Sequence, residues 1–153
     1  MKRIASFAVN HDKLERGIYV SRVDGDVITY DIRVKKPNGG AYLSNGVLHT
    51  LEHLFATYAR NSPFAAQVIY VGPMGCRTGF YLLLRDTVTK QNAIELVKAS
   101  FDFIVHFKGE IPGSRREECG NHREHDLKGA KKAAEEMLQV LENWSEEELK
   151  YPS

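Results

Sequence analysis

Residues 45–60 read Asn-Gly-Val-Leu-His-Thr-Leu-Glu-His-Leu-Phe-Ala-Thr-Tyr-Ala-Arg, and this stretch decides the fold. Its apolar residues recur at the three- and four-residue spacing of one helical face: Leu48, Leu51, Phe55 and Tyr58. The sequence Asn-Ser-Pro that follows is typical of a helix end. The stretch therefore predicts an amphipathic helix with one face packed on a core, and the other elements are placed around it.

Four short segments rich in β-branched and aromatic residues predict strands. They are residues 17–23, 27–34, 67–71 and 80–85. The first two segments are joined through an Asp-Gly pair, which is typical of a tight hairpin turn and predicts antiparallel pairing. Alternation along the second strand places Arg33 on the face opposite the apolar residues.

Two further helices complete the predicted architecture. Residues 89–107 and 127–144 carry apolar residues at helical spacing, and Gly and Pro residues break the chain between them. The sequence therefore predicts an α+β fold, with a four-stranded, mainly antiparallel sheet packed against about three helices. Because no linker or internal repeat divides the chain, residues 1–153 are expected to form a single domain.

The composition excludes several classes of protein. The 153 residues are 42% hydrophobic and 27% charged, which is typical of a globular domain. The formal net charge is +1, and acidic and basic residues are interspersed, so we expect no nucleic-acid or membrane partner. The apolar run at residues 4–9 is too short for a signal peptide. We therefore expect a cytoplasmic protein without a transmembrane span, acting on a small molecule.

The predicted helix at residues 45–60 carries a His-x-x-Glu-His motif. His49 and His53 are four residues apart, so both imidazoles lie on one helical face, at the spacing that a single metal ion requires. Glu52 lies beside them, where its carboxylate is available for proton transfer. Two exposed histidines and a solvated glutamate are the alternative. The interleaved apolar residues favour the metal site, because polar groups beside a buried stripe need partners.

A metal with two histidine ligands needs a third protein ligand, and one coordination position then stays open for substrate or water. Cys119, in the loop before the last predicted helix, is the candidate. A local site of Cys119, His122 and His125 is the alternative, but it leaves out the histidine pair and matches no established zinc spacing. We expect His122 and His125 to be solvated loop residues.

The second cysteine, Cys76, lies in a predicted tight turn between two strands. Such a turn exposes a side chain at the end of a sheet, which favours a reactive thiol, and the neighbouring Arg77 would favour the thiolate form. The alternative is a cysteine without a chemical role, since free cysteines usually behave as small apolar residues. The local sequence supports both interpretations equally.

Three motifs in order resemble those of the S-ribosylhomocysteine lyase (LuxS) family. They are His-Thr-Leu-Glu-His-Leu-Phe-Ala at residues 49–56, Pro-Met-Gly-Cys-Arg-Thr-Gly-Phe-Tyr at residues 73–81, and Cys-Gly at residues 119–120 followed by His-Asp-Leu at residues 125–127. The resemblance implies cleavage of S-ribosylhomocysteine to homocysteine and 4,5-dihydroxy-2,3-pentanedione, the precursor of a bacterial quorum-sensing signal. The reaction it implies is a metal-assisted carbonyl migration that ends in β-elimination.

The same resemblance implies a role for individual residues, an iron(II) cofactor that zinc or cobalt can replace, and a homodimer with active sites at the subunit interface. The implied metal ligands are His49, His53 and Cys119, the implied proton-transfer residues are Glu52 and Cys76, and the implied substrate contacts are Ser6, His11 and Arg33. Two positions depart from the family pattern. Tyr70 stands where relatives usually have an aspartate near the turn cysteine, and Lys35 stands where they often have a cysteine.

Two other functions fit part of the sequence. A zinc peptidase of the inverted-motif kind would use Glu52 to activate a metal-bound water. Such peptidases use a glutamate as third ligand and need no turn thiol, so Cys119 and Cys76 argue against this function. A metal-binding relative without turnover is the other alternative, and Tyr70 is the residue that keeps it open.

Overall fold

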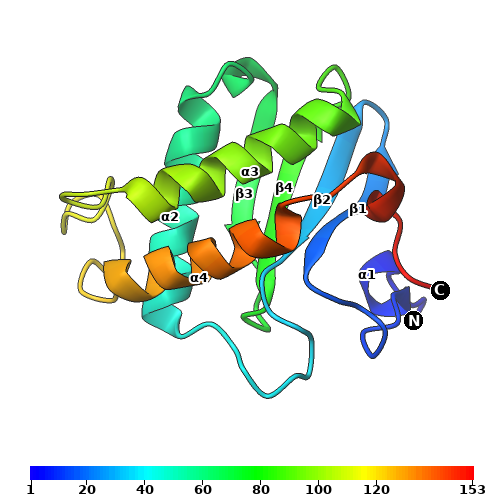
Figure 1. Cartoon of the computed structure of the whole chain (residues 1–153), viewed down its shortest axis with the longest axis horizontal. Helices are drawn as coiled ribbons and strands as arrows, with labels where there is room; N and C mark the ends of the chain where they lie inside the picture. The colour runs from blue at the N-terminus through cyan, green and yellow to red at the C-terminus, as the bar shows by residue number, and fades with distance from the viewer.

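The computed structural model describes residues 1–153 and has the predicted α+β architecture. One layer is a four-stranded antiparallel sheet in the order β1-β2-β4-β3, and three long helices cover one of its faces (Figure 1). The strands are β1 (Gly17–Asp24), β2 (Val27–Arg33), β3 (Val68–Pro73) and β4 (Gly79–Arg85). The long helices are α2 (Asn45–Asn61), α3 (Lys90–His106) and α4 (Leu127–Leu141). None of the helices is long and apolar enough to cross a membrane.

The structure adds three short elements that the sequence did not predict. They are α1 (Ala5–Ala8) and the 3-10 helices η1 (Ala65–Gln67) and η2 (Glu146–Leu149). A single turn is too short to show helical periodicity, so these elements leave no pattern to read. The helix predicted at residues 127–144 ends earlier, at Leu141, and Trp144 beyond it donates its indole N–H to the carbonyl oxygen of Ile18 at 3.1 Å.

Each long helix begins after a residue whose side chain accepts a backbone N–H. Ser44, Thr89 and Asp126 occupy these positions and accept from the residue three places further on. Such a cap satisfies an N–H group that has no partner inside the helix, and it stabilises a helix by about 1 kcal/mol. The backbone N–H of Asp126 also donates to the hydroxyl of Thr50 on α2, at 2.9 Å, so the start of α4 is tied to α2.

The two faces of the sheet differ in character. The inner face carries apolar side chains such as Ile32, which lies opposite Phe80 and belongs to the core beneath the helices. The outer face carries Asp31 and Arg33, which are only 1% and 3% exposed. Arg33 therefore points away from the apolar face, as predicted, and it is buried on the other side.

Gly79 marks a very close approach between two strands. It starts β4 opposite Arg33, and a Cβ at this position would collide with the carbonyl oxygen of Ile32. Because the colliding atom belongs to the backbone and cannot rotate away, we expect Gly79→Ala to lower the free energy of unfolding by about 2 kcal/mol or more. Chemical denaturation followed by circular dichroism measures this change.

Gly75→Ala is the matched control, since a Cβ on Gly75 would have open space around it. Its free energy of unfolding should stay within about 0.5 kcal/mol of the unmodified protein. Equal stability of the Gly79→Ala and Gly75→Ala variants would contradict the close approach.

Candidate metal centre

Four side chains from two segments converge on one face of α2. His49 and His53 come from α2, and Cys119 and His125 come from the loop between α3 and α4, drawn in yellow beside α2 in Figure 1. One ligand atom from each side chain lies within 4.8 Å of the other three. The Sγ atom of Cys119 is 3.3 Å from Nε2 of His49 and 4.0 Å from Nε2 of His125.

These separations fit a single metal ion. Tetrahedral coordination, with metal–nitrogen bonds of about 2.1 Å and metal–sulfur bonds of about 2.3 Å, places two nitrogen ligands about 3.4 Å apart and a nitrogen and a sulfur ligand about 3.6 Å apart. The separation between Cys119 and His49, at 3.3 Å, is within about 0.3 Å of the nitrogen–sulfur value, and imidazole with thiolate is a donor set that suits zinc and iron. The cluster can therefore close around one ion with small side-chain movements.

Backbone carbonyls fix the tautomer of both helix histidines. Nδ1 of His49 lies 2.9 Å from the carbonyl oxygen of Glu124, and Nδ1 of His53 lies 2.9 Å from that of Pro112. A carbonyl oxygen only accepts hydrogen bonds, so each ring proton is on Nδ1 and each Nε2 keeps its electron pair. This is the tautomer that binds a metal through Nε2, with the usual hydrogen bond behind it.

The prediction that His125 is a solvated loop residue is wrong. Its ring is partly buried and stacks on His49, with centroids 4.0 Å apart. Burial, followed by the nearby His49 and His53, lowers the pKa of His125 to about 4, so this imidazole is neutral at physiological pH. Two members of the local alternative, Cys119 and His125, thus join the helix pair, while His122 is not in the cluster.

The Nδ1 atom of His125 contacts a side-chain hydroxyl, whereas Nδ1 of His49 and of His53 contacts a backbone carbonyl oxygen. Its Nδ1 lies 3.0 Å from Oγ1 of Thr50, which can donate as well as accept. The contact holds the ring in place without fixing its tautomer. The only signal for His125 in the sequence is its proximity to Cys119, because the path of the loop depends on the distant Thr50.

Glu52 lies at the edge of the cluster, as predicted, and faces a cavity. Its Oε1 is 3.9 Å from Nε2 of His53, and its side chain is 30% exposed. The cavity has a volume of about 410 Å³ and is also lined by Tyr70. Tyr70 borders a second cavity of about 330 Å³, on the outer face of the sheet, which Ser6 lines. Tyr70 is therefore common to both cavities.

Cys76 lies exposed in the turn between β3 and β4. Its Sγ is 3.0 Å from Oγ1 of Thr78. The neighbouring Arg77 directs its guanidinium elsewhere, to the carbonyl oxygen of Leu43 at 3.2 Å. The guanidinium that reaches this turn belongs to Arg33, which donates to Oγ1 of Thr78 at 2.8 Å.

Arg33 is held in a buried ion pair. Its Nε and Nη2 groups donate to the carboxylate of Asp31 at 3.0 and 2.6 Å, and the hydroxyl of Tyr151 donates to the same carboxylate at 2.7 Å. Burial opposes the charge of Arg33, but the hydrogen bonds and attraction to Asp31 outweigh it and raise the pKa of the guanidinium. Arg33 therefore stays charged beside the turn that carries Cys76.

The N-terminal candidates lie apart from the metal cluster. Ser6 is on α1, and Nδ1 of His11 donates to the carbonyl oxygen of Val9 at 2.8 Å. Figure 1 shows α1 at one end of the sheet and the loop that carries Cys119 at the other. A single chain therefore does not bring Ser6 and His11 together with His49, His53 and Cys119.

Comparison with known proteins identifies the family. Residues 4–148 match the family model described as S-Ribosylhomocysteinase (LuxS). The chain is 47% identical to the S-ribosylhomocysteine lyase of Borreliella afzelii, with 99% of this chain and 100% of the relative covered. It is 45% identical to the protein of that name from Phocaeicola vulgatus, with 100% and 99% covered, and 44% identical to the one from Clostridium acetobutylicum, with 99% of each covered. The resemblance seen in the motifs is confirmed, and the chain belongs to the S-ribosylhomocysteinase (LuxS) family.

Proposed function

We propose that this chain is a carbon–sulfur lyase that cleaves S-ribosylhomocysteine to homocysteine and 4,5-dihydroxy-2,3-pentanedione. The observation that carries the proposal is the cluster of His49, His53 and Cys119 beside Glu52, with both imidazoles in the tautomer that binds a metal. Membership of the family and relatives named S-ribosylhomocysteine lyase over their full length support it. The same relatives give no support to the zinc-peptidase alternative.

The proposed metal ligands are His49, His53 and Cys119, and the proposed ion is iron(II), which zinc or cobalt can replace. When bound, the metal supplies Lewis acidity that polarises the carbonyl of the opened sugar. With His125 outside the proposed ligand set, two nitrogens and one sulfur leave a coordination position open, as catalytic sites require. The carbonyl groups of Glu124 and Pro112 hold the two helix rings in place for this purpose.

Glu52 and Cys76 are the proposed proton-transfer residues. Moving a carbonyl along the sugar chain requires a base that takes a proton from one carbon and an acid that returns one to its neighbour. Glu52 faces the cavity beside His53, and Cys76 is exposed in its turn. Once the carbonyl lies β to the carbon bearing sulfur, removal of the proton between them breaks the carbon–sulfur bond and releases homocysteine.

Ser6, His11 and Arg33 are the proposed substrate contacts, in a homodimer whose active sites use both chains. The proposal is supported by the separation of α1 from the metal cluster within one chain. The outer face also exposes apolar side chains beside Ser6, since Ile4 is 54% and Tyr70 is 52% exposed. Two further parts of the proposal come from the family resemblance alone, namely a cytoplasmic location and a product that serves quorum sensing.

The proposed reaction is tested by incubating the iron-loaded protein with S-ribosylhomocysteine without oxygen. We expect free thiol to accumulate, because homocysteine carries one and the substrate does not. Titration of thiols, with mass spectrometry of both products, measures the reaction. An iron-loaded, folded protein that releases no homocysteine would refute the lyase function and leave the metal-binding relative as the remaining alternative.

Cys119→Ala tests the ligand set. Loss of the only sulfur ligand should weaken binding of iron or zinc at least about tenfold, because the cluster then offers neutral imidazoles and no thiolate. Metal content after dialysis against a weak chelator measures the change, with unmodified protein alongside. A variant that retains its full metal content would show that Cys119 is not a ligand.

Cys76→Ala tests the proposed proton transfer by the turn thiol. In contrast to Cys119→Ala, it should affect turnover and not metal binding. The variant should keep its metal, since Cys76 is not in the cluster, and should lose at least about a hundredfold in kcat, the lower range for a general acid or base. Metal analysis and the thiol assay on the same sample separate the two effects. Turnover at the unmodified rate would remove Cys76 from the mechanism.

A further inference from the structure

Cys76 stands at the end of a hydrogen-bond relay that begins at the C-terminus. The hydroxyl of Tyr151 donates to Asp31 at 2.7 Å, and Arg33 donates to the same carboxylate through two N–H groups. A third N–H of Arg33, on Nη1, donates to Oγ1 of Thr78 at 2.8 Å, and this oxygen is 3.0 Å from Sγ of Cys76. The relay thus connects residue 151 to the turn thiol through four contacts.

The chemistry of the groups fixes the direction of the last contact. A guanidinium has donors only, so the Thr78 hydroxyl oxygen accepts from Arg33. Thr78 is 2% exposed, and the one acceptor within hydrogen-bonding distance of its hydroxyl proton is the sulfur of Cys76. If the thiol donated instead, the buried hydroxyl proton would be left without a partner, which costs free energy. Thr78 therefore donates to Cys76.

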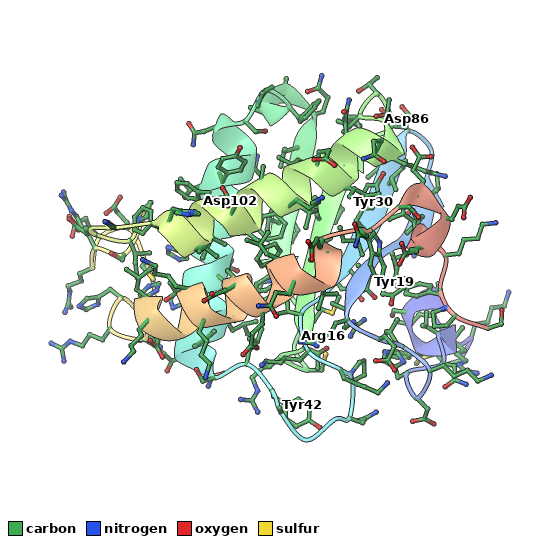
Figure 2. The ribbon with its side chains drawn as sticks, in the orientation of Figure 1. Arg16, Tyr19, Tyr30, Tyr42, Asp86 and Asp102 are labelled. Carbon is green, nitrogen blue, oxygen red and sulfur yellow. The ribbon has the colours of Figure 1, made fainter.

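Every member of the relay upstream of Cys76 is held in place. The carbonyl oxygen of Thr78 accepts from the N–H groups of Val34 and Lys35, at 2.8 and 2.9 Å. The ring of Tyr151 stacks on Tyr19, with centroids 5.3 Å apart, and Figure 2 shows Tyr19 on β1 beside the C-terminal segment. Burial, followed by the negative charge of Asp31, raises the pKa of Tyr151, so its hydroxyl remains a donor.

We propose that Thr78 is a positioning residue that donates a hydrogen bond to the sulfur of Cys76 and holds it ready to react, and that Tyr151 anchors the other end of the relay. A sulfur that accepts a hydrogen bond is stabilised most when it is negatively charged, so the contact favours the base over the thiol. Among the charged and titratable groups that face this network are Arg33, Asp31, Tyr81 and Tyr151, of which Arg33 is the cation. The inference deepens the proposed function, because it rests on Cys76 as a proton-transfer residue.

Alkylation of Cys76 by iodoacetamide tests the relay, because only the thiolate reacts and no substrate is needed. We expect Thr78→Val, which replaces the hydroxyl by a methyl group of similar size, to slow alkylation about tenfold near neutral pH and to recover at alkaline pH. Thr78→Ser keeps the hydroxyl and should react within about twofold of the unmodified protein. Mass spectrometry of the peptide that contains Cys76 gives the rates in the metal-loaded, full-length protein.

Ser100→Ala is the matched control for the loss of a buried hydroxyl. Ser100 is fully buried in α3 and donates to the carbonyl oxygen of Leu96 at 2.7 Å, remote from the turn in sequence. This variant should alkylate at the unmodified rate. A rate as low as that of Thr78→Val would mean that general destabilisation alters the surroundings of Cys76, and it would overturn the proposal.

Tyr151→Phe provides a second, independent arm. It removes the hydroxyl and keeps the ring on Tyr19, so we expect a smaller loss, about threefold, near neutral pH. If Thr78→Val does not fold, as judged by circular dichroism and metal content, Tyr151→Phe decides the question. The proposal is overturned if folded Thr78→Val is alkylated at the unmodified rate, or if Thr78→Ser is alkylated as slowly as Thr78→Val. Where Thr78→Val does not fold, an unmodified alkylation rate in Tyr151→Phe overturns it.

The alkylation and turnover measurements test the relay and the proposed lyase function independently. If Thr78→Val slows alkylation but the unmodified protein releases no homocysteine, the relay is supported and the proposed lyase function is refuted. If the unmodified protein turns over substrate but Thr78→Val does not change the alkylation rate, the lyase function is supported and the relay is refuted. In an active protein, Thr78→Val should also lower kcat with little change in KM, because Thr78 is buried and acts through Cys76.

Discussion

One buried hydroxyl connects the two segments that form the candidate metal centre. Thr50 lies between the two histidines of the motif, is fully buried, and accepts the backbone N–H of Asp126 at 2.9 Å. The same oxygen holds Nδ1 of His125 at 3.0 Å. Because Asp126 also caps α4, this contact fixes the point where the loop ends and the helix starts. The loop is thereby pressed against α2, and Cys119 comes within 3.3 Å of His49. Without that anchor, the motif would be two histidines on a helix.

The candidate metal centre and the turn that carries Cys76 depend on different electrostatic interactions. Neutral carbonyl dipoles orient the rings of His49 and His53, and His125 beside them stays uncharged. The turn of Cys76 depends instead on a buried ion pair of Asp31 and Arg33. Such a pair pays a desolvation penalty that often cancels its attraction, so stability is a weak reason for its presence. A fixed positive charge beside the turn that carries Cys76, the proposed proton-transfer residue, is a stronger reason.

Sequence reasoning succeeded where the signal was local and missed what depends on distant contacts. The helix at residues 45–60 and its histidine pair follow from periodicity, and the sheet follows from short β-rich segments. His125 was missed because its position depends on Thr50, 75 residues away. Arg77 was expected to act on Cys76 because it is the next residue, yet its positive φ of 62° is part of a turn that sends the side chain to Leu43. The effective cation, Arg33, is a neighbour only through the pairing of β2 with β4.

Tyr70 on β3 lines two cavities and packs on a glycine of its own strand. Its ring lies over Gly72, where a Cβ would collide with it, so an aromatic residue at position 70 is matched by the absence of a side chain at position 72. Tyr70 borders both the cavity of Glu52 and the cavity of Ser6. A phenol offers a hydrogen-bond donor and no negative charge. Tyr70 therefore forms part of the wall of both cavities without adding a charge to either.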